Sequence, residues 1–133
     1  MWHFIQFLFL FIAGHSLADT ALQPDAMGRG KSRLRKIDIS RVPPGQKPLN
    51  LWFMWLSHHA VLHGLIVTCI TYFLVQDKFF AINLGIIEFI LHWIIDFYKC
   101  EGKYNPYIDQ GLHYLVKIGF VIMILTSFNF LWF

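Results

Sequence analysis

One stretch of the sequence combines groups capable of chemistry with the spacing of a helix. Glu88, His92 and Asp96 recur at every fourth position inside an otherwise apolar run. Residues four apart lie one above another on an α-helix, so these side chains are expected to form one polar stripe. Imidazole and carboxylate groups bind metal ions and transfer protons, and they are costly inside a membrane-like environment unless other groups meet them. The stripe therefore predicts a site that other helices complete.

Pairs of the same kind occur at three other places in the chain. In each pair a histidine stands four positions from an aspartate or from a second histidine, as in His15 with Asp19, His59 with His63, and Asp109 with His113. Together with His92 and Asp96, one pair falls in each of four apolar segments.

The composition explains why those segments matter. The chain has 133 residues, of which 56% are hydrophobic and only 14% are charged. This balance argues against a soluble domain and is typical of a membrane protein. Four segments approach or exceed the roughly 20 helical residues that cross a hydrocarbon core, at about residues 2–22, 49–75, 79–97 and 107–133. We predict an all-α fold, a polytopic membrane four-helix bundle, in a single domain over residues 1–133.

The first segment has a second interpretation as a cleaved signal peptide, because Ser16-Leu17-Ala18 is similar to a small-residue cleavage site. However, no Lys or Arg precedes the apolar run, whereas a signal peptide begins with positive charge. His15 and Asp19 also fall in register with the other pairs. A retained helix is the favoured interpretation.

Positive charge is concentrated on one side of this arrangement. Residues 23–48 carry seven Lys or Arg against two Asp, while the opposite side receives Lys78 and little else. By the positive-inside rule, this basic loop faces the cytoplasm and both termini face away from it. Its cations are expected to contact anionic lipid headgroups, at about 1 kcal/mol each, or alternatively to capture a phosphorylated substrate. No nucleic acid is expected, since the loop lacks interleaved aromatic residues for stacking. Oligomers are compatible with the sequence.

The four pairs share one depth in the membrane. Counting about 20 residues inward from each non-cytoplasmic helix end puts the cytoplasmic boundary beside all of them. Four-helix bundles build two-metal sites from inward-facing residues in this way, and mixed imidazole and carboxylate ligands suit Zn, Mn and non-haem Fe. We therefore predict a centre for a divalent metal, with two ions, held by His15, Asp19, His59, His63, His92, Asp96, Asp109 and His113.

Two further residues are candidates for catalysis. Glu88 lies about two turns deeper than Asp96, and we interpret it as a carboxylate that orients His92, with a general base or a protonated buried acid as alternatives. Lys99 and Lys117 are interpreted as lysines that extend to the interface. If the substrate is phosphorylated, Lys99 is the better placed of the two to meet it.

Short motifs from all four segments carry a resemblance to a known family. They are Leu17-Ala18-Asp19 with Leu22-Gln23, His59-x-x-x-His63-Gly64, His92-Trp93-Ile94-Ile95-Asp96-x-x-Lys99, and Asp109-Gln110-x-Leu112-His113. In combination they resemble the domain-of-unknown-function family thirty-three-zero-seven, whose members are small multi-helix membrane proteins of bacteria and their phages. The resemblance implies a multi-pass protein of the bacterial inner membrane with a shared site, and it names no reaction.

The predicted centre is best suited to a metal-dependent membrane hydrolase, because a metal ion activates water and polarises a phosphoryl or acyl oxygen. A site at headgroup depth suits a lipid-linked or phosphorylated amphipath. A membrane di-iron oxidase is an alternative, since His58-His59-x-x-x-His63 is similar to a histidine box. A proton or metal-ion conduit is another, although residues 64–75 and 119–125 are nearly all apolar. Haem held by two histidines would leave the carboxylates without a role.

Overall fold

The computed structural model describes residues 2–36, 43–47 and 49–128. All regular structure in these ranges is helical, so the all-α prediction is confirmed for the described part of the chain. Four helices are long and one is short, and they follow one another as α1 (Trp2–Thr20), α2 (Asp25–Gly30), α3 (Trp52–Val75), α4 (Lys78–Cys100) and α5 (Pro106–Ser127).

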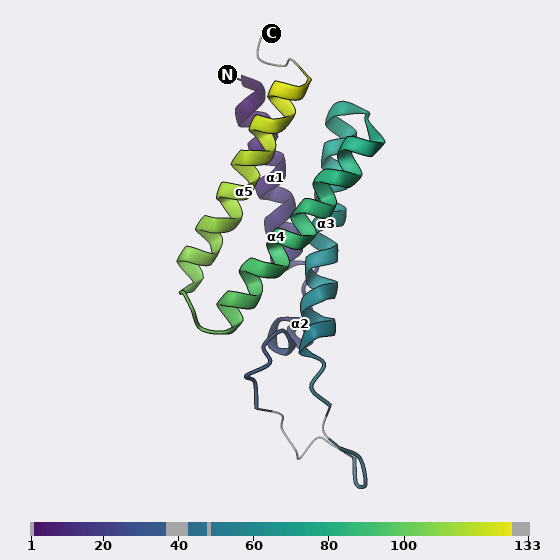
Figure 1. Ribbon diagram of the computed structural model, residues 1–133, viewed down its shortest axis with the longest axis vertical. Helices are drawn as coiled ribbons and strands as arrows, with labels where there is room; N and C mark the ends of the chain where they lie inside the picture. Colours follow the sequence, from purple (N-terminus) through teal and green to yellow (C-terminus); the bar gives the residue numbers. More distant parts are fainter. Residues whose placement is uncertain (1, 37–42, 48, 129–133) are drawn as a thin grey trace.

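The four long helices run up and down in sequence order (Figure 1). Contacts join α1 to α3, α3 to α4, α4 to α5, and α5 back to α1, while α2 packs against α3. The start of α1, the α3–α4 turn and the last turn of α5 lie at one end of the molecule, and α2 and the α4–α5 turn lie at the other (Figure 1). Parts of different helices that were predicted to lie at the same depth in the membrane are therefore at the same end of the bundle.

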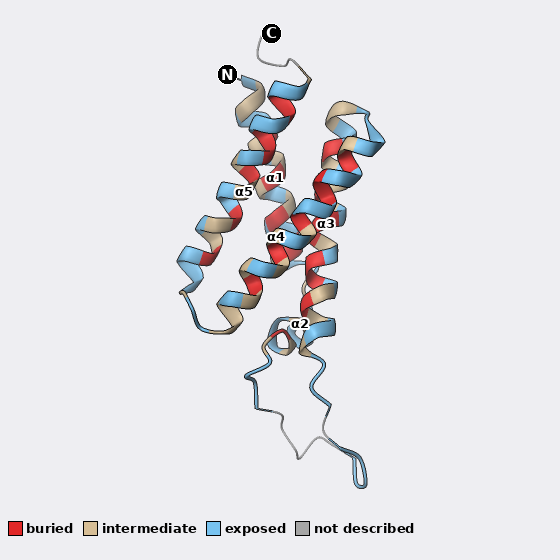
Figure 2. Ribbon diagram, in the orientation of Figure 1, coloured by how far each residue is buried: buried red, intermediate tan, exposed pale blue. Residues whose placement is uncertain are grey.

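The outer surface of the bundle is apolar. In the described residues, α3, α4 and α5 are long and apolar enough to cross a membrane. Only 33–39% of the residues in the most apolar stretch of each of these helices are buried inside the structure. Large side chains such as Phe73, Phe79 and Leu115 are exposed instead, and Figure 2 shows exposed positions along the length of α3, α4 and α5. Helix α1 is not among these three candidates, and polar residues including Gln6 and His15 lower its hydropathy. A surface of this kind suits hydrocarbon rather than water.

The interior of the bundle has an apolar half and a polar half. The apolar half is a cluster of buried side chains from all four long helices: Phe7, Phe11, Val67, Leu84, Phe120, Val121, Ile124 and Leu125. These residues belong to the first part of α1, the last parts of α3 and α5, and the first part of α4. They therefore fill the end of the bundle away from α2 (Figure 1).

Local signals set the helix ends. The Asp77 side chain caps α4 by accepting a hydrogen bond from the backbone N–H of Phe80 at 3.0 Å. Asn105 caps α5 in the same way, and Pro106 takes the first helical position, where a backbone N–H is not needed. The turn between α4 and α5 is therefore confined to residues 101–105.

The predicted segment limits need four corrections. Residues 23–48, expected to be a loop, contain α2, which an Asp25–Arg29 ion pair at 3.2 Å supports across one turn. Helices α1 and α3 are shorter than segments 2–22 and 49–75. At the end of α1, the backbone N–H groups of Ala21 and Leu22 both donate to the Leu17 carbonyl, and at the start of α3 the Asn50 side chain accepts from the Trp52 backbone N–H at 3.3 Å. Helix α4 extends beyond segment 79–97 at both ends, and α5 ends at Ser127. The last residues of segment 107–133 lie outside the described ranges.

Helices α3 and α4 approach most closely where two glycines face each other. A Cβ atom on Gly64 would lie 2.7 Å from the carbonyl oxygen of Gly85, and one on Gly85 would lie 1.9 Å from Thr68 Oγ1. Thr68 is held in place because its hydroxyl donates to the Gly64 carbonyl at 2.9 Å. Membrane helices commonly use small residues for close backbone contact. Gly64 follows His63 directly, so this contact also positions the histidines of α3 against α4.

Replacing Gly85 with Ala should therefore destabilise the bundle by about 1–3 kcal/mol, because the added methyl group meets Thr68 and the α3 backbone. Thermal unfolding of the detergent-purified protein would measure the loss. Gly111→Ala is the matched control, since its Cβ would meet no described atom within 4 Å and a helical alanine is favoured over glycine by about 1 kcal/mol. Equal melting temperatures for the two variants would contradict the close contact.

Candidate metal centre

The polar half of the interior contains all eight residues predicted as metal ligands. The five histidines among them are 0–2% exposed, and Asp96 and Asp109 are each 1% exposed. Asp19 is the most open of the eight, with 25% of its side chain exposed. The four pairs, which come from four different helices, thus converge on one buried cluster.

One part of the cluster surrounds Asp19 of α1. Its Oδ1 atom lies 3.1 Å from His63 Nε2 and 3.2 Å from His59 Nε2. Its Oδ2 atom lies 3.4 Å from His15 Nε2. Gln110 of α5 supports this arrangement, because its amide nitrogen lies 3.3 Å from Asp19 Oδ2 and its amide oxygen lies 3.3 Å from His15 Nε2.

The other part of the cluster surrounds Asp96 of α4. Its Oδ2 atom lies 3.5 Å from His59 Nε2 and 3.9 Å from His92 Nε2. Its Oδ1 atom lies 3.6 Å from His113 Nε2, which is also 3.6 Å from Asp109 Oδ1. Histidines from α3, α4 and α5 therefore lie around the Asp96 carboxylate.

His92 connects the two parts. Its ring stacks on that of His63 with 3.6 Å between centroids, and on that of His113 with 4.2 Å between centroids. The His59 ring lies 4.9 Å away and the His15 ring 5.7 Å away. Five imidazoles from four helices thus form one continuous group.

Several ring nitrogens in this group lack a hydrogen bond. In the described part of the chain, neither nitrogen of His59 nor of His92 has a well-directed hydrogen-bond partner, although carboxylate oxygens lie close to them. An unsatisfied buried polar group costs about 1–3 kcal/mol. Two ligand atoms that each lie about 2.1 Å from a tetrahedral Zn²⁺ ion are about 3.4 Å from each other. The distances from the Asp19 and Asp96 oxygens to the neighbouring histidine nitrogens range from 3.1 to 3.9 Å and so include that value. A metal ion would therefore satisfy these atoms.

Three groups of described residues each bring donor atoms within 4.8 Å of one another. They are His15, His63, Glu88 and His92; Asp19, His59, His63 and His92; and His92, Asp96 and His113. Asp109 belongs to none of these groups, and Glu88 belongs to one. Seven of the eight predicted ligands are thus placed to share a metal ion, while Asp109 contacts the cluster through His113 and Lys99.

Two lysines hold the carboxylates at the loop end of the cluster. Lys31 follows α2 and is only 5% exposed, and its Nζ atom lies 2.6 Å from Asp96 Oδ2. Lys99, predicted as a catalytic candidate, donates to Asp96 Oδ1 and to Asp109 Oδ2, each at 2.9 Å. Sequence reasoning missed Lys31 because it is one of several cations in a polar stretch with no helical periodicity.

Lys117 forms a deeper buried pair. Its ammonium group donates a hydrogen bond to Glu88 Oε1, and each residue is 1% exposed. The interpretation of Lys117 as a lysine that extends to the interface is therefore wrong, because an internal carboxylate replaces water as its partner. Glu88 Oε1 also lies 3.4 Å from His92 Nδ1, although the two atoms form no well-directed hydrogen bond, so the orienting role of Glu88 stays a prediction. Whether Glu88 takes part in catalysis stays a prediction.

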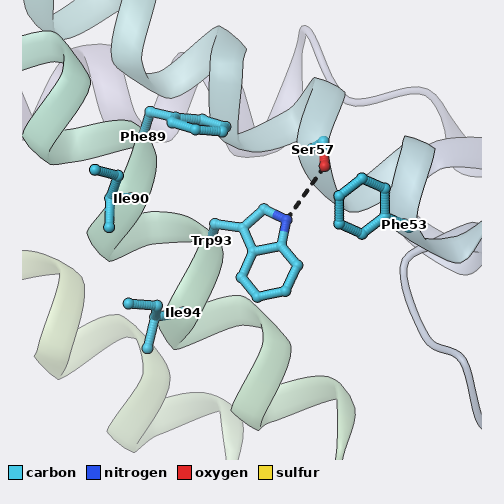
Figure 3. Close-up of a pocket in the computed structure, with 6 residues that line it drawn as sticks. All are labelled: Phe53, Ser57, Phe89, Ile90, Trp93 and Ile94. Carbon is cyan, nitrogen blue, oxygen red and sulfur yellow. Dashed lines mark hydrogen bonds between the residues drawn. The ribbon is translucent and has the colours of Figure 1, made fainter.

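Aromatic side chains of α3 and α4 lie together close to the cluster in sequence. Trp93 stacks on Phe97 with 5.3 Å between ring centroids, and its indole nitrogen donates to Ser57 Oγ at 3.2 Å (Figure 3). Trp93, Ser57 and Phe53 line part of a largely apolar groove of about 240 Å³ to which no residue of the cluster contributes. Tryptophan side chains gather at headgroup depth in membrane proteins. Their position beside Asp96 on α4 agrees with a site close to the membrane boundary.

The chain matches no known protein family, no curated protein and no solved structure. The resemblance to the domain-of-unknown-function family thirty-three-zero-seven therefore stays a prediction, and the cluster has to be interpreted from its own chemistry.

The cluster should bind metal through its central residues. We expect His92→Ala and Asp96→Ala to lose most of the metal that elemental analysis finds in the detergent-purified wild-type protein, since each removes a donor from the group that contains His113. His58→Ala is the matched control, because His58 is exposed and adjacent to His59. Metal contents that do not differ among the three variants would show that these donors are structural.

The Glu88–Lys117 pair should behave as a coupled unit. Lys117→Met would leave the Glu88 carboxylate buried without its cation and should destabilise the protein by about 3–5 kcal/mol. Combining it with Glu88→Gln should recover a large part of that loss, because the second change removes the unpaired charge. Unfolding of the single and double variants in detergent measures the coupling, and strictly additive effects would contradict it.

Proposed function

We propose that this protein is a metal-dependent hydrolase of the bacterial inner membrane, acting at the cytoplasmic boundary on an amphipathic substrate that is lipid-linked or phosphorylated. The observation that carries the proposal is the set of buried ring nitrogens that face Asp19 and Asp96 without hydrogen bonds. Cation binding gives these atoms a partner, and the mixed donor set suits Zn, Mn or Fe.

The proposed orientation follows from charge. The basic stretch at residues 23–48 faces the cytoplasm, and both termini lie on the opposite side, by the positive-inside rule. Helix α1 crosses the membrane together with the three strongly apolar helices, because it contacts α3 and α5 and contributes His15 and Asp19 to the cluster.

Two divalent ions are proposed, one on each side of His92. Asp19, His59 and His63 would hold the first, and Asp96 and His113 would hold the second, with His92 close to both. Metal ions held by these residues would supply a bound water of lowered pKa, about 7 for zinc, and would polarise the oxygen of the bond under attack. The water oxygen then bonds to phosphorus or to an acyl carbon, the ester bond breaks, and the leaving oxygen takes a proton.

The chain's own residues suit the proton transfers of that reaction. Asp19 and Lys99 are partly open, with 25% and 27% of their side chains exposed, so they mark the side from which water and substrate enter. Asp19 is placed to accept a proton from the attacking water. Lys99 is placed to contact an anionic substrate at the same entrance.

The charge balance also favours binding of cations followed by an anion. In their ordinary charged forms, four carboxylates of the cluster face three ammonium groups, which leaves one negative charge when the histidines are neutral. One divalent ion would make the cluster positive, and two would give it three positive charges. A phosphorylated substrate would then neutralise much of that charge.

The structure favours the hydrolase over a conduit. A path for protons or ions needs polar groups along the whole bundle, and the buried cluster that includes Phe11, Leu84, Phe120 and Ile124 fills the half away from α2. The di-iron oxidase shares the same donors and differs in its metal and in its use of oxygen.

The proposed activity can be tested with purified protein reconstituted separately with Zn²⁺, Mn²⁺ or Fe²⁺. We expect release of inorganic phosphate from phosphatidic acid in mixed micelles, abolished by a chelator. Asp96→Asn should lower the rate by about 100-fold or more, since it removes a ligand charge. His58→Ala should retain the wild-type rate. Iron-dependent oxygen consumption without ester hydrolysis would favour the oxidase and contradict the hydrolase.

A further inference from the structure

We infer that Lys31 and Lys99 together form an anion subsite that holds the phosphate group of a phosphomonoester substrate. This inference rests on the proposed function and gives it a substrate class. Lys31 is presented by residues 30–33, which we call the strap and which begin at the last residue of α2.

The strap is fixed to the bundle on both sides of Lys31. On one side, a Cβ atom on Gly30 would lie 2.4 Å from Trp55 Cδ1, so only glycine lets the chain pass this close to α3. On the other side, the Ser32 hydroxyl donates to the Cys100 carbonyl at 3.3 Å. Arg33 then donates two hydrogen bonds to Glu101, at 2.7 and 2.6 Å. These contacts direct the Lys31 side chain into the cluster.

The Arg33–Glu101 contact has a measurable electrostatic consequence outside the membrane-spanning segments. The two hydrogen bonds hold the pKa of the Glu101 carboxyl below its ordinary value and raise that of the Arg33 guanidinium. The pair therefore stays charged at neutral pH, and the strap stays attached to the end of α4.

The two ammonium groups lie on opposite oxygens of one carboxylate. Lys31 contacts Asp96 Oδ2 at 2.6 Å, and Lys99 contacts Asp96 Oδ1 at 2.9 Å. The same carboxylate faces His59, His92 and His113. An anion held by metal ions on these donors would therefore lie close to both lysines.

Phosphate is the ligand that this arrangement fits best. When Asp96 donates its oxygens to metal ions, Lys31 loses the carboxylate it contacts in the described structure, and Lys99 keeps only Asp109. A further anion would then partner the two ammonium groups. A phosphomonoester offers a double negative charge and several oxygens in different directions, and lysine ammonium groups bind phosphate as compact point charges. A neutral carboxylic ester or amide could not balance two cations in a buried site.

The location suits a headgroup. Lys31 follows α2 and Lys99 is in the last turn of α4, and Figure 1 shows α2 and the α4–α5 turn at the same end of the bundle. Lys99 is 27% exposed. Arg35 and Lys36 follow the strap and are exposed, so they can attract anionic substrates toward the same end. Arg41, another cation of the basic stretch, lies outside the described residues.

The subsite can be tested by isothermal titration of the metal-loaded protein in detergent with inorganic phosphate. Lys31→Met and Lys99→Met should each weaken phosphate binding by about 10- to 100-fold, the loss expected for one charge-assisted hydrogen bond of about 1.5–3 kcal/mol. Lys103→Met is the matched control, because Lys103 is an exposed lysine in the α4–α5 turn. It should bind phosphate as the wild type does.

The Lys31→Arg variant distinguishes the effect of the positive charge on phosphate binding from a structural role of the side chain. It should retain phosphate binding within about tenfold of wild type, because it keeps the cation. Equal losses in Lys31→Arg and Lys31→Met would overturn the inference by showing a structural role for this position, and so would wild-type affinity in Lys31→Met. Elemental analysis of the same samples keeps the two proposals separate. A wild-type protein without metal would contradict the proposed function, while the lysine variants would still test anion binding.

Two competitors identify the source of the phosphate. Phosphatidic acid in mixed micelles should displace inorganic phosphate at lower concentration than glycerol 3-phosphate does if the ligand is a lipid headgroup. Equal potency would assign the subsite to a free phosphomonoester. Phosphatidylcholine, whose phosphate is a diester beside a cation, should not compete, and effective competition by it would overturn the assignment to a phosphomonoester.

Discussion

The buried carboxylate of Asp96 is the group on which the arrangement of this protein depends. A charge removed from water costs several kcal/mol unless opposite charges and hydrogen bonds surround it. Asp96 obtains them from the strap through Lys31, from its own helix through Lys99, and from α3 and α5 through His59 and His113. Satisfying one side chain therefore fixes the mutual positions of four parts of the chain.

The rest of the bundle is arranged around that requirement. The half of the interior away from α2 is filled with apolar side chains, and the outer surface is apolar as well. The close contact of Gly64 and Gly85 allows α3 and α4 to bring their histidines together. Among the described residues, the buried ionisable groups lie in the polar half of the interior, and this placement is compatible with the proposed chemistry on a headgroup.

Much of the site could be predicted because two physical rules act on the same residues. Helical periodicity places residues four apart on one face, and the cost of ionisable groups in an apolar segment implies partners for them. His92 and Asp96 illustrate both rules, and their predicted companions lie beside them in the structure. Lys31 could not be found in this way, because neither periodicity nor apolar surroundings distinguish it from its basic neighbours.

The sequence by itself thus determined the helical class, the four histidine- and aspartate-containing pairs and the end of the bundle at which they meet, since these follow from local spacing and composition. Only the tertiary structure decided which atoms face one another. It placed Lys117 on Glu88, made His92 the link between the two parts of the cluster, and brought Lys31 across to Asp96. Pairing between distant side chains depends on how the helices pack, and no local pattern records it.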